Sequence, residues 1–159
     1  MKSFWGKVKK GQSRGKDLGF PTANTSLHQK IEEGIYLAKV TVHGNVISSE
    51  GTHRLVHPEV EKFRSKDAKK DSSTSFRSAQ NDKTYNALTF IGAAKTFGET
   101  KTQAESYLLD FSGNLYGKYI TVQLLKKLRD NKKFTSAEDL KKQMNEDLLN
   151  ARKFFLEWC

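Results

Sequence analysis

The sequence lacks several features that mark particular classes of protein. Its 159 residues include one cysteine, Cys159, so it cannot form an internal disulfide or a thiolate metal site. No segment approaches the roughly 20 apolar residues of a membrane-spanning helix. The first residues also lack the apolar run of a secretory signal. These absences exclude a disulfide scaffold and a membrane partner, and they predict a protein of the reducing cytoplasm.

Acidic residues are scarce in the first 30 positions, where Asp17 stands against seven lysines and arginines. The whole chain carries 28 basic and 18 acidic residues, a net charge of +10. A basic, glycine-rich segment predicts an anionic partner. Nucleic acids and small phosphorylated ligands are both partners of this kind. The alternative interpretation is a solvated basic surface, so charge alone does not identify the partner.

The length suits a single domain, 1–159, with its own core. Segment 48–84 is rich in Ser, Lys, Asp and Asn, which predicts a mobile polar insertion with a short helix at 58–69. Four segments have the β-branched and aromatic content of strands, namely 35–42, 86–91, 104–111 and 119–125. Alternation along the first and last of these predicts one apolar face on each strand.

The C-terminal segment has the pattern of a helix. Ser136 suits the N-cap, and Asp139 follows three residues later as in a capping box. Apolar residues then recur at helical spacing, at Leu140, Met144, Leu148, Ala151 and Phe155. Short strands with glycine turns and one terminal helix predict a mainly β fold. We expect a small antiparallel β-barrel with a C-terminal α-helix and a polar insertion loop.

Segment 11–21 contains three glycines and a proline, which predicts a loop. It is not a nucleotide P-loop, because Gly11 and Gly15 are one residue too close and no Ser or Thr follows Lys16. Glycines still allow backbone N–H groups to approach phosphate oxygens, and basic side chains neutralise their charge. The candidate phosphate-binding residues are Gly11, Arg14, Gly15, Lys16 and Gly19.

Thr22 and Asn24 follow this loop one residue apart, so in an extended segment their side chains face the same side. A hydroxyl and an amide oxygen are hard ligands that suit Mg²⁺. Two neutral ligands bind a cation poorly by themselves. The remaining negative charge would therefore have to come from the phosphates of a nucleotide.

These residues resemble the signature loop of riboflavin kinases, in which Pro21, Thr22, Ala23 and Asn24 form the characteristic tetrapeptide. Further segments resemble that family in the same order along the chain, at 34–36, 90–98, 105–111, 115–117, 128–130 and 133–134. The resemblance covers nearly the whole chain apart from 48–84. It implies a six-stranded antiparallel barrel of Greek-key type. The implied reaction moves the γ-phosphoryl group of ATP to the 5′-hydroxyl of riboflavin, giving FMN and ADP.

The resemblance also implies roles for individual residues. Gly11 and Lys16 would contact the nucleotide, together with Thr22, and the metal would bind Thr22 and Asn24. Magnesium is the expected ion, with zinc and manganese left open.

Two further residues receive roles from the same resemblance. Glu105 stands where the family has its catalytic base, whereas spacing alone favours an outward-facing surface glutamate. Arg129 lies in the region that contributes to the flavin site.

The sequence departs from the family at three positions. Phe90 replaces the usual asparagine, Lys95 the usual proline, and Tyr107 a common histidine. The first two leave open a degenerate kinase that binds flavin as a sensor, and the basic composition leaves open a nucleic-acid-binding β-barrel. We expect a monomeric kinase that binds no nucleic acid. Bacterial members of the family commonly carry an adenylyltransferase domain ahead of the kinase domain, and this sequence does not include one. We therefore also expect FMN production without FAD synthesis.

Overall fold

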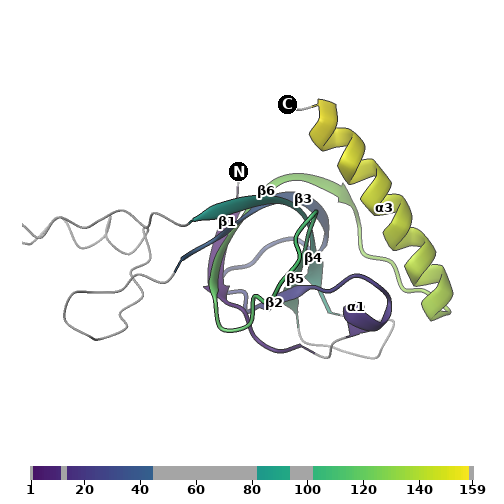
Figure 1. Ribbon diagram of the computed structural model, residues 1–159. Coiled ribbons are helices and arrows are strands. Elements are labelled where there is room, and N and C mark those ends of the chain that lie inside the picture. The colour runs from purple at the N-terminus through teal and green to yellow at the C-terminus, as the bar shows by residue number, and fades with distance from the viewer. Residues whose placement is uncertain (1, 12–13, 45–81, 94–101, 158–159) are drawn as a thin grey trace, which may run out of the picture.

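The computed structural model describes residues 2–11, 14–44, 82–93 and 102–157. The helix predicted at 58–69, Lys95 and most of the predicted insertion lie outside these ranges. The described chain forms a six-stranded antiparallel sheet that curls towards a barrel, with one long helix beside it (Figure 1). None of the helices in these ranges is both long and apolar enough to cross a membrane. The predicted mainly β fold with a C-terminal helix is therefore confirmed.

The strands are β1 (Lys2–Lys7), β2 (Ala23–Thr25), β3 (Gly34–Val42), β4 (Lys83–Gly92), β5 (Gln103–Leu108) and β6 (Tyr119–Arg129). Their order in the sheet is β1-β6-β3-β4-β5-β2, and every neighbouring pair is antiparallel. The curl brings the two edges together, because the Lys9 N–H donates to the Asn24 carbonyl at 2.9 Å. The loop after β1 thus lies against the strand that carries a candidate metal ligand.

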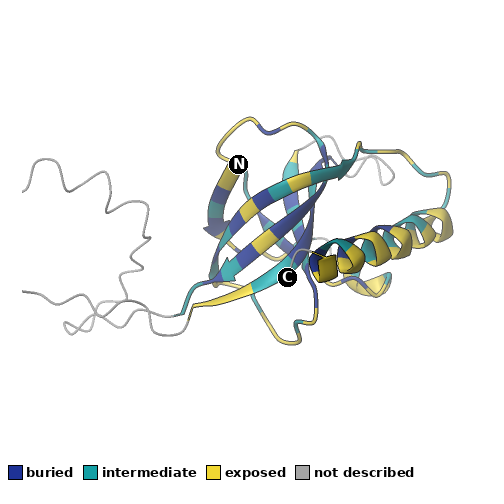
Figure 2. Cartoon of the chain, turned by 90° about the horizontal axis from the view of Figure 1, so that it is seen from above, coloured by how far each residue is buried: buried dark blue, intermediate teal, exposed yellow. Residues whose placement is uncertain are grey.

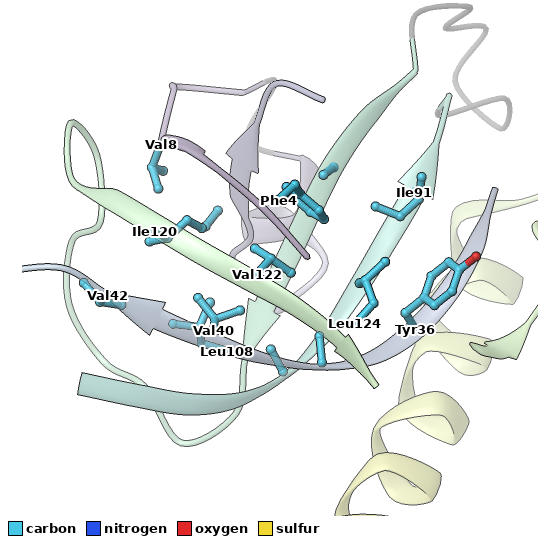
Figure 3. Packing of buried hydrophobic residues seen from close by; sticks show 14 of the residues in the cluster. Phe4, Val8, Tyr36, Val40, Val42, Ile91, Leu108, Ile120, Val122 and Leu124 are labelled. Atoms are coloured by element: carbon cyan, nitrogen blue, oxygen red, sulfur yellow. The ribbon is translucent and has the colours of Figure 1, made fainter. Parts of the chain in front are cut away.

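The barrel interior is filled by alternate residues of the strands, as the two-residue period of a strand requires (Figure 3). The predicted apolar faces are confirmed, and the residues of β3 and β6 in this interior cluster are Tyr36, Ala38, Val40, Val42, Ile120, Val122 and Leu124. Phe4 of β1, Ile91 of β4 and Leu108 of β5 belong to the same cluster. This interior is mostly apolar and holds the strands in register.

A second apolar cluster lies outside the barrel, where α3 (Ala137–Glu157) packs on the sheet. Leu37 and Leu88 contact Ala151 and Phe155 of the helix within this cluster. The Ser136 hydroxyl accepts the Asp139 N–H at 3.1 Å, which confirms the predicted N-cap. Much of the remaining surface of α3 is exposed (Figure 2).

Several predicted boundaries were wrong. β4 begins at Lys83, so the last two residues of the predicted insertion 48–84 belong to a strand. β5 ends at Leu108 instead of continuing to 111, because Asp110 adopts a turn conformation with a φ of 57°. β6 continues to Arg129 through two register shifts against β3. The short strands β1 and β2 had not been recognised from their pattern.

Candidate active site

The candidate site forms where β2 pairs with β5. Asn24 lies directly opposite Glu105 in this pairing, and Ala23 lies opposite Ser106. The Thr22 hydroxyl donates to Glu105 Oε2 at 3.3 Å, although 83 residues separate the two. The sheet therefore brings both predicted metal ligands and the predicted catalytic carboxylate to one place.

Glu105 occupies the outer face of β5. Ala104, Ser106 and Leu108 point into the barrel and are buried, which leaves Glu105 on the opposite face at intermediate exposure. The Ser106 hydroxyl pairs with that of Thr89 at 2.9 Å inside the barrel. Glu105 is thus outward-facing, as the spacing predicted, but it is not a freely solvated surface residue.

Both carboxylate oxygens of Glu105 are hydrogen-bonded. Gln103 Nε2 donates to Oε1 at 2.7 Å, and Thr22 holds Oε2 at the longer distance of 3.3 Å. Phe90 lies opposite Glu105 on the neighbouring strand β4. The carboxylate is therefore held by Gln103 of β5 and by Thr22, the residue before β2, and an aromatic residue of β4 occupies the paired position beside it.

The glycine-rich loop packs closely on these side chains. A Cβ atom placed on Gly11 would lie 2.4 Å from Asn24 Nδ2, so the Asn24 side chain would have to move to admit it. A Cβ on Gly15 would lie 2.3 Å from the Phe20 carbonyl oxygen and 3.3 Å from Thr22 Oγ1. Glycine at these two positions lets the loop backbone lie directly against the predicted metal ligands.

A single helical turn, α1 (Arg14–Asp17), carries the predicted basic residues of the loop (Figure 1). Arg14 begins this turn, and the side chain of Lys16 is exposed. The turn closes when Gly19, with a φ of 88°, donates its N–H to the Lys16 carbonyl at 3.0 Å. Phe20 then packs edge-on against Tyr107 of β5, with ring centroids 5.4 Å apart. This contact fixes the loop to the strand that carries Glu105.

The described residues offer no cluster of three or more His, Cys, Asp or Glu side chains that could hold a metal ion. The oxygen atoms of Thr22 and Asn24, close to the Glu105 carboxylate, fit a hard divalent cation better than a soft one. Such neutral ligands require further negative charge, which a nucleotide triphosphate carries.

Arg129 lies apart from this group, since β3 and β4 separate β6 from β5 in the sheet. Its guanidinium donates to both carboxylate oxygens of Asp147 on α3, with Nη2 at 2.6 Å from Oδ2 and Nε at 2.9 Å from Oδ1. The side chain of Asp147 is 5% exposed. The pair fastens α3 to the barrel, and the flavin-binding role of Arg129 stays a prediction.

Lys127, which lies two residues before Arg129 on β6, also pairs with acidic side chains. Hydrogen bonds from Lys127 to Asp130 and to Glu32 hold the pKa of the lysine above its ordinary value. The basic residues at this end of β6 are therefore matched by acidic residues of the protein itself.

Two residues of these arrangements were missed by sequence reasoning. Gln103 stands two positions before Glu105, which in a strand places it on the same face, so the period itself was an available signal. Asp147 lies three residues after Met144 and four before Ala151, on the same helix face as the apolar stripe, so the helical period was an available signal that it is buried.

Comparison with known proteins finds matches along nearly the whole chain. The family model described as riboflavin kinase matches residues 2–155. The trifunctional protein RibF/MnmA of Mycoplasmoides gallisepticum is 33% identical over 153 residues, which cover 94% of this chain and 18% of that protein. The bifunctional riboflavin kinase/FMN adenylyltransferase of Haemophilus influenzae is 29% identical over 154 residues, which cover 96% of this chain and 38% of that protein. The chain thus spans well under half the length of these curated relatives.

A solved structure shares the fold. The riboflavin kinase from Trypanosoma brucei aligns with 97% of this chain and 79% of its own, at a TM-score of 0.57 and 19% identity. At this identity the likeness concerns the fold alone.

Proposed function

Because the chain belongs to the riboflavin kinase family, we propose that it transfers the γ-phosphoryl group of ATP to the 5′-hydroxyl of riboflavin, forming FMN and ADP. Members of this family bind riboflavin and ATP and use a divalent metal. The observation that carries the proposal is the contact between Thr22 and Glu105, with Asn24 opposite Glu105 on the paired strand.

The reaction forms one bond and breaks another. The 5′-oxygen of riboflavin bonds to the γ-phosphorus, the bond from that phosphorus to the β–γ bridging oxygen breaks, and ADP leaves. The hydroxyl proton passes to the Glu105 carboxylate as the new bond forms, because a primary alcohol is a weak nucleophile while it keeps its proton. Phosphoryl transfer otherwise depends mainly on positioning and on neutralisation of charge.

The glycine-rich loop would bind the phosphates of ATP. The backbone at Gly11 and Gly15 approaches the site without obstruction by side chains, and Gly19 permits the turn that returns the chain to β2. Arg14 and Lys16 would supply positive charge from α1. Close backbone approach and nearby cations together are what a phosphate group requires.

Thr22 and Asn24 would hold the divalent cation, and we propose magnesium because both ligands are hard oxygen donors. When bound, the ion would neutralise part of the charge on the transferring phosphate. Arg129 is proposed to contribute to the flavin site. Since its guanidinium is bound to Asp147, it would do so by fixing the end of β6.

We propose that this enzyme is a monomer of the cytoplasm, which is the expectation from the sequence. An FMN-forming assay, together with binding measurements, separates this kinase from a flavin sensor and from a nucleic-acid-binding module. Incubation with riboflavin, ATP and magnesium, followed by chromatography, should yield FMN that depends on all three. Tight riboflavin binding without FMN would instead indicate a flavin sensor. Oligonucleotide binding with a steep salt dependence and no flavin binding would indicate a nucleic-acid-binding module.

A further inference from the structure

Gln103 makes a short hydrogen bond to the Glu105 carboxylate. Its side-chain nitrogen Nε2 lies 2.7 Å from Glu105 Oε1, whereas the Thr22 hydroxyl lies 3.3 Å from Oε2. An ionised carboxylate can only accept hydrogen bonds, so the amide must present its N–H₂ group to it and not its oxygen. The donor at 2.7 Å is at the strong end of the usual range, and the one at 3.3 Å is beyond its ordinary limit.

The two side chains are neighbours because of the strand that carries them. Residues two apart on β5 share a face, and the alternation of buried Ala104 and Ser106 fixes that face as the outer one. β5 is itself held between β4 and β2, where Gly92 lies opposite Gln103 and Asn24 lies opposite Glu105. Gln103 is therefore supported by regular backbone pairing and not by a loop.

We infer that Gln103 is a positioning residue, which holds Oε1 of Glu105 so that Oε2 is the oxygen that takes the proton from the acceptor hydroxyl. A glutamate has three rotatable side-chain bonds, and one strong hydrogen bond restricts their rotation. The hydrogen bond from Thr22 to Oε2 is long, so a substrate hydroxyl can replace it at small cost. The inference rests on the proposed function, because it assigns work to the proposed base.

Two variants remove this hydrogen bond in different ways. Gln103→Leu keeps a side chain of similar size without a donor. Gln103→Glu keeps the length but replaces the donor by a second carboxylate, which would repel that of Glu105. Both variants should lower kcat about tenfold, a part of the 10²- to 10⁴-fold that a general base supplies. The KM values for riboflavin and ATP should change much less, because Gln103 is assigned no contact with either substrate.

Gln123→Leu is the matched control. Gln123 lies on β6, on the side of the strand opposite to buried Val122 and Leu124, and β3 and β4 separate it from β5. This substitution should leave kcat unchanged. Thermal unfolding of all variants would show whether any loss of activity follows from a loss of stability.

A double-mutant cycle tests whether Gln103 acts through Glu105. In a Glu105→Gln background, Gln103→Leu should have almost no further effect on kcat, because the group it positions has already been removed. A further tenfold loss in that background would overturn the inference in favour of a general structural role. FMN formation by wild type together with an unchanged kcat in Gln103→Leu would overturn this inference alone. An inactive wild-type protein would overturn the proposed function and this inference with it.

Discussion

Two carboxylates outside the barrel interior have opposite surroundings. Asp147 lies on the face of α3 that packs on the barrel and is almost fully buried, and Arg129 of β6 donates to both of its oxygens at 2.6–3.1 Å. Glu105 is only half buried, and one of its oxygens is held at 3.3 Å by a side chain that is also a candidate metal ligand. The first arrangement has no capacity left for a ligand, whereas the second can change partners. The comparison shows two different uses of the outer face of the sheet. At the fastened end, Arg129 of β6 binds α3 through a buried ion pair, and at the adaptable end the Glu105 carboxylate of β5 can exchange a hydrogen-bond partner.

The largest effect should follow from removing the adaptable carboxylate. Glu105→Gln keeps the shape of the side chain but cannot accept a proton at neutral pH, so kcat for FMN formation should fall about 10²-fold or more. The melting temperature should change little, because Glu105 contributes nothing to the apolar interior. Steady-state kinetics and thermal unfolding measure the two effects.

Glu138→Gln provides the control for Glu105, because Glu138 is exposed in the first turn of α3. It should retain normal turnover. Near-normal turnover in Glu105→Gln would remove Glu105 from the mechanism.

A smaller loss should follow from altering Thr22, the proposed metal ligand that contacts Glu105. Thr22→Ala removes one oxygen donor, so the magnesium concentration needed for half-maximal activity should rise about tenfold. Riboflavin binding, followed by fluorescence, should be nearly unchanged. Thr41→Ala, on the outer side of β3, is the control. Equal losses of magnesium response and riboflavin binding would indicate that Thr22 is structural.

A single added methyl group should displace the glycine-rich loop, which packs on Asn24 beside the Glu105 site. In Gly11→Ala the new Cβ would overlap Asn24 Nδ2, so the loop and the amide must separate. Displacement of this kind should raise the KM for ATP about fivefold, a modest share of what misplacement of a binding group costs. In the control Gly6→Ala, the new Cβ would meet its nearest atom at 3.6 Å, an ordinary contact. An unchanged KM in Gly11→Ala would argue against close packing of the loop on Asn24.

Breaking the Arg129–Asp147 ion pair at the fastened end should lower the stability of the protein and should affect its activity least. Asp147→Asn leaves the partly buried Arg129 without its counter-ion, and the free energy of unfolding should fall by about 3 kcal/mol. Asp110→Asn breaks a pair with Arg152 whose side chains are 73% and 47% exposed, and it should cost less than about 1 kcal/mol. Urea denaturation measures both. Equal costs for the two variants would contradict the distinction between a buried and an exposed pair.

The regular parts of the fold could be predicted because their patterns are local. Alternation along β3 and β6 reflects one face in the core, and Ser136 carries the chemistry of a helix cap in its own side chain. β1 and β2 escaped recognition for a physical reason. β2 has three residues, too few for a period, and β1 interrupts its apolar pattern with Gly6 between charged ends.

The residues of the candidate site could not be identified from local sequence patterns. The resemblance to riboflavin kinases, and not any spacing, singled out Glu105, because an outward residue of a strand looks the same whether it is catalytic or solvated. The proximity of Thr22 and Glu105 depends on pairing between segments 83 residues apart. The ion pair of Arg129 with Asp147 likewise joins two elements whose packing no periodicity specifies.

A crystal structure with riboflavin, magnesium and a non-hydrolysable ATP analogue would test the central claim most directly. We predict the cation at the oxygen atoms of Thr22 and Asn24 and the 5′-hydroxyl of riboflavin about 2.6–3.2 Å from a carboxylate oxygen of Glu105. Binding of either substrate at another surface, with the Glu105 carboxylate directed into solvent, would contradict the account.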